Sequence, residues 1–346
     1  MKFLFLFFII SSSYAGGFSG INDPQRILKG YNSTFFKLPL NGEISNKQLS
    51  WPGSHWPNYV GGITHRWSKL DPNPFYYEYK TFDYLLTADQ SEIDELSPAE
   101  KFDILLGDYN FNISRRIEAK YSPKENTWHG ICHGISGAQL NHDEPKLTTV
   151  KNDDGIEITF YSSDLKGLLG YYYANVAKNY ASQVGKRCTG KRQRRGKCKG
   201  VNAGSFHILI SNFLGVKGKP ILMDIDHLRE VWNYSAVSYD SYIVDEHKPS
   251  RNSSRGTVKR IRVQTELVVE SSIQQKTEAV IGTENAEYLY NNYDYYLDID
   301  KDGKIIGGEW ISDIKPDFLF TRKKAEFTGK WEKIFDVYTN GLTQTL

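Results

Sequence analysis

The stretch TWHGICHGISGAQL, residues Thr127–Leu140, predicts a helix that begins at a cysteine. Glycines flank Cys132 at Gly130 and Gly134, and the ISGAQL that follows is typical of the first turns of a helix. The free amides and the dipole at a helix N-terminus favour a thiolate over a thiol. Cys132 is therefore a candidate nucleophile, and the alternative is a buried structural thiol.

The N-terminus predicts an exported protein. An apolar run at residues 3–10 follows one lysine, and Ser13-Tyr14-Ala15 has the small-x-Ala pattern of a signal-peptide cleavage site. The run is far shorter than the roughly 20 residues that span a bilayer, and we expect no other membrane span. We expect the signal peptide, residues 1–15, to be removed near Ala15, which gives a secreted or periplasmic protein.

Export constrains the three cysteines of the chain. In an oxidising compartment Cys188 and Cys198 are the expected disulfide pair, because they bracket the short basic loop TGKRQRRGK. Cys132 then remains unpaired, and nucleophilic catalysis is the commonest reason for an unpaired thiol in an exported protein. We expect the basic loop to be exposed and solvated, and a proteolytic activation site is the alternative.

Composition and element order indicate an ordered α+β protein. Aromatic residues make up 14% of the 346 residues, and the formal net charge of +2 gives no global attraction to nucleic acid. A capping-box pattern predicts a helix over 97–108, and leucines at helical spacing predict a second helix over 162–181. Strands are expected over 205–215, 219–226, 259–272, 288–299 and 304–311. Helices that precede antiparallel strands favour the α+β class.

The chain divides into segments of different character. The expected divisions are the signal peptide (1–15), an irregular lead-in (16–50), a catalytic core (51–250), and a β-rich C-terminal extension packed on that core (251–346). The last boundary is placed in the polar stretch EHKPSRNSSRGT.

His207 and Asp224 complete a candidate catalytic triad with Cys132. His207 lies at the start of an apolar run that is interpreted as a strand, which is a rigid place for an imidazole base. Asp224 lies in the next predicted strand, where it could accept the ring N–H of His207. A buried strand histidine without a catalytic role is the alternative for His207, and Asp226 competes with Asp224 for the third position.

Five stretches of the chain resemble, in the same order, the elicitor-type transglutaminases of Phytophthora. They are SPAEKFDILLGD, TWHGICHG, SSDLKGLL, SFHILISNFLG and DIDHLREVWN, and the resemblance extends from about Trp51 to Leu319. An elicitor peptide of the family begins Val-Trp-Asn, but VWNYSAVSYDSY here lacks the glutamine-proline that follows, so the resemblance does not extend to recognition by plants. The resemblance implies a papain-like, transglutaminase-type core, with the nucleophile at a helix N-terminus and an antiparallel sheet that carries His and Asp.

The resemblance also implies an activity, the γ-glutamyl transfer of protein-glutamine γ-glutamyltransferases. Cys132 would form a thioester with a protein glutamine, His207 would protonate the leaving ammonia, and a lysine amine would resolve the thioester. The backbone N–H of Cys132 is one candidate oxyanion donor, and Asn126 or Trp128 is the other. The expected partners are proteins with accessible glutamine and lysine. The alternatives are a cysteine peptidase on the same fold and a non-enzymatic secreted elicitor or binding protein.

The stretch LDIDKDGKIIGGE, residues 297–309, matches the pattern of a calcium-binding loop. Its candidate ligands are Asp298, Asp300, Asp302 and Glu309. The flanks are strand-like rather than helical, which favours a hairpin with its turn at Asp302-Gly303. A calcium site is the alternative, and calcium would then be the one expected cofactor.

Overall fold

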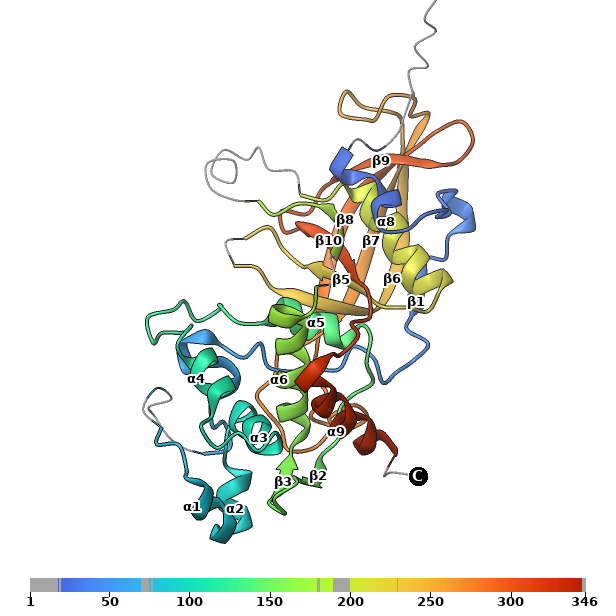
Figure 1. Ribbon diagram of the computed structural model, residues 1–346. Helices are drawn as coiled ribbons and strands as arrows, with labels where there is room; N and C mark the ends of the chain where they lie inside the picture. The colour runs from blue at the N-terminus through green and yellow to red at the C-terminus, as the bar shows by residue number, and fades with distance from the viewer. Residues whose placement is uncertain are drawn as a thin grey trace, which may run out of the picture.

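The computed structural model describes residues 18, 20–69, 75, 77–178, 181–188, 200–228 and 230–343. Figure 1 shows two halves, one mostly helical and one built on a large antiparallel sheet. The predicted signal peptide, residues 1–15, lies outside the described residues. Within the described ranges, no helix has both the length and the apolar character needed to cross a membrane.

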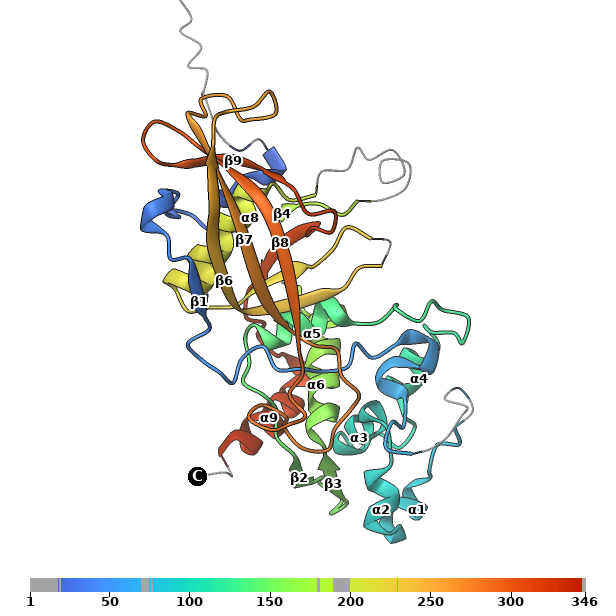
Figure 2. The same cartoon turned by 180° about the vertical axis from the view of Figure 1, so that it is seen from behind.

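The helical half packs its helices around a core of aromatic and aliphatic side chains. Its helices are α1 (Phe82–Thr87), α2 (Gln90–Asp94), α3 (Pro98–Leu105), α4 (Asn112–Glu118), α5 (Cys132–Gln139), α6 (Ser162–Tyr171) and α9 (Glu332–Thr343). A small hairpin of β2 (Thr148–Lys151) and β3 (Glu157–Phe160) closes the end far from the large sheet (Figure 2). Trp51, Trp56 and Phe102 are almost fully buried in this core.

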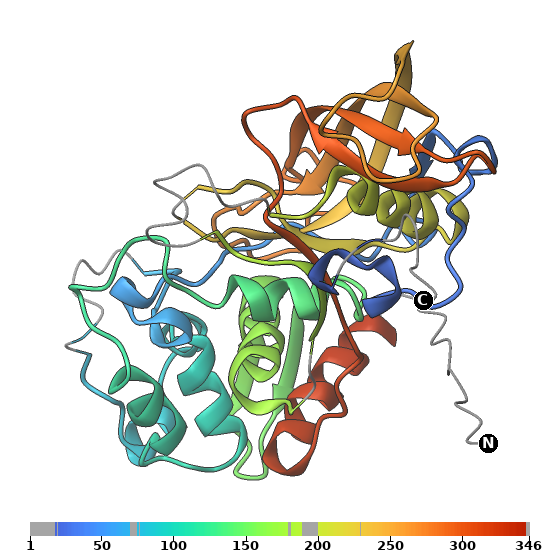
Figure 3. The same ribbon diagram turned by 90° about the horizontal axis from the view of Figure 1, so that it is seen from above.

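The other half is one sheet covered by a helix. Its strands are β1 (Asn41–Glu43), β4 (Ala181–Gly185), β5 (Ile221–Asp224), β6 (Asn233–His247), β7 (Lys259–Glu270), β8 (Tyr288–Ile299), β9 (Ile305–Trp310) and β10 (Phe318–Arg322). The strand order is β4-β10-β5-β6-β7-β8-β9, and β1 pairs with β6 outside this path. Helix α8 (Ala203–Ile210) packs on one face of the sheet (Figure 3), where Gly204 allows it to approach β9 closely.

The predicted strand over 205–215 is wrong, because this segment is helical. Residues Ala203–Ile210 form α8, and a π-helical turn continues it over Ser211–Val216. All residues of α8 are buried, so the helix has no solvent-facing polar stripe and its sequence shows no 3.6-residue period. The signal that identifies the helix is Asn202, whose side chain caps it by accepting a hydrogen bond from the Gly204 N–H.

Most of the other predicted elements are confirmed, with changed ends. Ser97 caps α3 with Glu100 in a reciprocal capping box, as expected. The predicted helix over 162–181 ends earlier, because α6 gives way to a π-helical turn over Tyr172–Val176. The strands expected over 219–226, 259–272, 288–299 and 304–311 correspond to β5, β7, β8 and β9.

The polar stretch near residue 250 connects β6 to β7, which pair along most of their lengths. Strands on both sides of this stretch therefore belong to one sheet. Helix α5 lies where the helical half meets this sheet (Figure 1), and this junction carries the candidate site.

Candidate active site

Cys132 is the first residue of α5, as the sequence predicts. The segment before it is held against the Trp51–Trp67 loop, since the Ile131 N–H donates to the carbonyl of His55 at 2.8 Å. Gly130 makes this approach feasible, because a Cβ there would lie 2.3 Å from the same carbonyl oxygen. The thiol is free, and its side chain is partly exposed.

The sulfur of Cys132 lies between the start of α5 and the segment that leads into β6. The side-chain amide of Asn233 donates to Sγ at 3.4 Å, and the thiol donates to the Val231 carbonyl at 3.8 Å. A cavity of about 190 Å³ opens beside the thiol. Its other lining residues are Asn58, Trp128, His129, Gly130, His133, Val231 and Asn233. A second, much smaller void beside Cys132 is lined in part by His55 and Tyr234.

The expectation that the helix N-terminus makes Cys132 a thiolate is outweighed by burial. Burial raises the pKa of the Cys132 thiol above its usual value, and the nearby carboxyl of Asp224 raises this pKa further. Hydrogen bonds from Asn233 and from the backbone N–H of His133 lower the pKa only in part. The resting sulfur is therefore a thiol at neutral pH, and it needs a base to become a nucleophile.

Alkylation of Cys132 by iodoacetamide is expected to accelerate with pH through a midpoint above that of a free cysteine, about 8.5. Only the thiolate reacts, and a raised thiol pKa moves its formation to higher pH. Asp224→Asn removes a nearby negative charge and should lower the midpoint, whereas the exposed Asp313→Asn should not change it. Mass spectrometry of the labelled peptide measures each rate. A wild-type midpoint at pH 7 or below would contradict a raised pKa of the Cys132 thiol.

The structure does not place His207 on a strand opposite Asp224. His207 lies in α8, is fully buried, and shares a hydrogen bond of 2.8 Å between its Nδ1 and the hydroxyl of Tyr295. It lines neither of the two spaces beside Cys132. Burial lowers the pKa of His207 to about 3, so the ring is a neutral part of the core. The expected geometry is wrong because a fully buried helix was interpreted as a strand.

Asp224, in contrast, lies near the thiol. It ends β5 directly opposite Asn233 of β6, and its Oδ1 accepts the backbone N–H of Trp232 at 3.1 Å. Burial raises the pKa of Asp224 to about 8, and the neighbouring carboxyls of Asp317 and Asp226 act in the same direction. Asp226, the competing candidate, is half-buried and accepts the backbone N–H of Leu228 at 2.7 Å.

His129, which the sequence analysis did not single out, lines the cavity beside Cys132. Its Nδ1–H donates to the carboxylate of Glu125 at 2.8 Å, and its Nε2 accepts from the amide of Asn126 at 3.4 Å. A carboxylate that holds one ring nitrogen is the arrangement that orients a histidine base. The signal in the sequence is a glutamate four residues before a histidine, Glu125 and His129, just before the cysteine.

Two more histidines lie close to Cys132, and both have other partners. His55 donates from Nε2 to the carbonyl of Thr127 at 3.1 Å, and burial lowers its pKa. His133 follows Cys132 in α5, and burial together with the charge of Arg322 lowers its pKa. Both rings are therefore neutral at pH 7.

The two candidate oxyanion side chains have different positions. Trp128 lines the cavity, and its ring packs edge-on against His129 with 4.3 Å between centroids. Asn126 holds His129 instead and does not line the cavity. The amide of Asn233 is a donor that the sequence analysis missed, although it lies within the VWN stretch.

The Asp298–Glu309 segment forms the β8–β9 hairpin, with its turn over residues 300–304. Asp298 and Glu309 both bind Arg260, at 3.0 and 2.7 Å. Asp300 accepts the backbone N–H groups of Asp302 and Lys304 within the turn. A guanidinium among the candidate ligands does not fit a calcium ion. In the described part of the chain, no cluster of three or more acidic, histidine or cysteine side chains could hold a metal.

The expected disulfide falls partly on residues that the structure does not describe. Cys188 is buried, and its backbone N–H donates to the carboxylate of Asp317 at 2.7 Å. Cys198 lies outside the described residues, as does most of the basic loop. The pairing of Cys188 with Cys198 therefore stays a prediction.

Comparison with known proteins gives one family and one solved structure. The family model described as "Transglutaminase elicitor" matches residues 112–328, more than half of the chain. The crystal structure of the GP42 transglutaminase from Phytophthora sojae superposes with a TM-score of 0.69 at 20% identity, over 91% of this chain and 95% of that chain, and it shows a shared fold. No curated protein matches. The matched region contains Cys132, α8 and the whole path from β4 to β10, and the chain belongs to the transglutaminase elicitor family.

Proposed function

We propose that the protein is a secreted protein-glutamine γ-glutamyltransferase with Cys132 as its nucleophile. The observation that carries this proposal is a free thiol at the start of α5, beside a cavity that is also lined by His129, whose ring is paired with Glu125. Family membership and the fold shared with a transglutaminase support the same activity. The signal-peptide pattern at residues 1–15 supports secretion.

The first half-reaction forms a thioester. The Asn126 amide gives up its long hydrogen bond to His129 Nε2. Nε2 then takes the proton of the Cys132 thiol, and the sulfur attacks the side-chain carbonyl carbon of a protein glutamine. The proposed oxyanion donors are the Cys132 backbone N–H and the amide of Asn233, which lies 3.4 Å from Sγ, with Trp128 as a further candidate. When the C–N bond breaks, the proton moves from His129 to the leaving amine, and ammonia departs.

The second half-reaction transfers the acyl group to a lysine amine. The neutral amine attacks the thioester carbonyl, and His129 accepts the proton that the amine loses. The C–S bond then breaks and releases an isopeptide, and the proton returns from His129 to the Cys132 sulfur to restore the resting thiol. Water in place of the amine gives deamidation of the glutamine.

Incorporation of fluorescent cadaverine into dimethylcasein tests this proposal. We expect labelled casein from the wild-type protein, and a label on glutamine side chains by peptide mass spectrometry. Reactions with added calcium and with EDTA should proceed equally, since Arg260 pairs with two of the four candidate calcium ligands, Asp298 and Glu309. Cleavage of the casein backbone without incorporation would instead identify a cysteine peptidase. If neither incorporation nor cleavage is observed, the protein is a non-enzymatic elicitor or binding protein.

His129→Ala is expected to lower kcat/KM for cadaverine incorporation about 10²-fold, the usual contribution of a general base. The reason is that no carboxylate-paired imidazole then remains beside the Cys132 thiol in the described cavity. Steady-state kinetics with the cadaverine assay measures the loss. Because a raised pH also forms the thiolate, the loss should shrink at alkaline pH.

His247→Ala is the matched control for this prediction. His247 forms a similar exposed pair with Asp245, at 2.7 Å, but it lies in β6 and does not line the Cys132 cavity. The control variant should keep wild-type kinetics. Full activity of His129→Ala together with a loss in His55→Ala would assign the base to His55 instead.

A further inference from the structure

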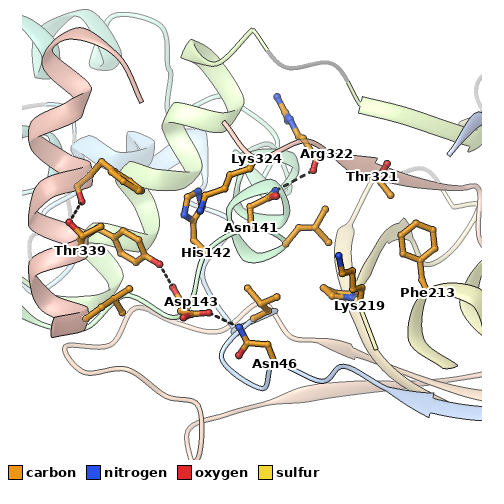
Figure 4. A pocket seen from close by; sticks show the side chains of 16 residues that line it. Asn46, Asn141, His142, Asp143, Phe213, Lys219, Thr321, Arg322, Lys324 and Thr339 are labelled. Atoms are coloured by element: carbon orange, nitrogen blue, oxygen red, sulfur yellow. Dashed lines mark hydrogen bonds between the residues drawn. The ribbon is translucent and has the colours of Figure 1, made fainter. Parts of the chain in front are cut away.

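A larger cavity, of about 610 Å³, is drawn in Figure 4. It opens between α9, the chain that follows α5, the residues before β5, and the end of β10. Its lining residues include none of those around the Cys132 cavity. The volume is within the range of small-molecule sites, roughly 300–1,000 Å³.

Half-buried apolar side chains form much of the cavity wall. They are Leu49, Leu140, Phe213, Phe335 and Leu342. They are partly buried residues packed against three separate hydrophobic clusters, and the cavity lies between these clusters. The cavity therefore offers an apolar surface for a ligand body of comparable size.

Positive charge lines the same cavity. Lys219, Lys324 and Arg322 contribute three cations, whereas Asp143 is the one acidic residue among the lining residues. The carboxylate of Asp143 already accepts the side-chain amide of Asn46 at 2.8 Å. His142 adds no charge, because burial and the nearby Lys324 lower its pKa to about 3.

The two lysines, rather than Arg322, are available to a ligand. The guanidinium of Arg322 donates to the carbonyls of His133 and Tyr173, at 3.2 and 2.6 Å. Lys219 and Lys324 are exposed, and neither forms an ion pair with another described residue. Two uncompensated ammonium groups beside an apolar wall select for a ligand that combines an anionic head with an apolar body.

We propose that this cavity binds an amphipathic organic anion. Its apolar body packs on Leu140, Phe213 and Phe335, and its carboxylate or phosphate head group lies between Lys219 and Lys324. This site is independent of the reaction at Cys132.

Titration with the fluorescent sulfonate 1-anilinonaphthalene-8-sulfonate tests the proposal on the full chain. We expect saturable binding that the double variant K219E/K324E weakens about tenfold or more, because both cations beside the head group are replaced by carboxylates. Lys333→Glu makes the same kind of charge change at an exposed position of α9 outside the cavity, and it should leave binding unchanged. Thr339→Trp should block binding, because Thr339 lies on the α9 wall and a large side chain fills the space.

Displacement of the probe distinguishes the two head groups and the role of charge. Decanoate and decyl phosphate are both expected to displace it, and the stronger competitor identifies the preferred head group. Decanol, with the same chain and no charge, should displace it far less. Equal displacement by decanol, or unchanged probe binding in K219E/K324E, would overturn the proposal. Near-UV circular dichroism of each variant verifies that its fold is intact.

Discussion

Cys132→Ala is expected to reduce cadaverine incorporation by about 10⁴-fold or more, because loss of the nucleophile leaves only binding and oxyanion stabilisation. No other free thiol is present among the described residues, and no serine, threonine or lysine lines the cavity beside it. The cadaverine assay measures the rate, and alkylation by iodoacetamide should disappear at the same time. Substrate binding should persist, so the loss is expected in kcat.

Ser136→Ala is the matched control for this loss. Ser136 lies in the next turn of α5, is fully buried, and its Oγ has no hydrogen-bond partner in the structure. Its truncation also removes one heavy atom from the same helix, and it should leave the activity at the wild-type level. If Cys132→Ala retained measurable turnover while Ser136→Ala did not, the nucleophile would have been misassigned.

The position of Cys132 at the start of a helix could be predicted from the sequence, because its signal is local. A cysteine between glycines at a helix start needs only a few neighbouring residues to be identified, and the structure places Cys132 at the start of α5. The histidine partner depends on tertiary structure. A continuous apolar run around His207 is compatible with a buried strand or a buried helix, and only packing against Tyr295 and the sheet decides between them.

The protonation state of the Cys132 thiol also could not be predicted from the sequence. The helix N-terminus favours the thiolate, but the depth of burial and the position of Asp224 raise the pKa of Cys132. Neither burial nor the β5–β6 register that places Asp224 opposite Asn233 can be deduced from local patterns. Similarly, the sequence matches the calcium-loop pattern, but two of its four carboxylates, Asp298 and Glu309, bind Arg260 from another strand.

Lys101→Met is expected to destabilise the protein by about 3–5 kcal/mol, the usual cost of leaving one charge of a buried pair alone. Lys101 Nζ lies 2.6 Å from Asp164 Oδ2, and both side chains are fully buried where α3 meets α6. Asp164 also accepts from the indole N–H of Trp67 and the backbone N–H of Tyr161. These neutral donors remain in the variant but do not balance the charge. Urea unfolding followed by circular dichroism measures the change in free energy.

Two comparisons separate the cost of the orphaned charge from the loss of the contact itself. The double variant K101M/D164N removes both charges and should be more stable than Lys101→Met alone, because no unpaired carboxylate is then buried. Lys47→Met breaks the exposed pair with Glu43, at 57% and 67% side-chain exposure, and should change stability by less than about 1 kcal/mol. If Lys101→Met and Lys47→Met were equally mild, the α3–α6 junction would have to admit water to Asp164.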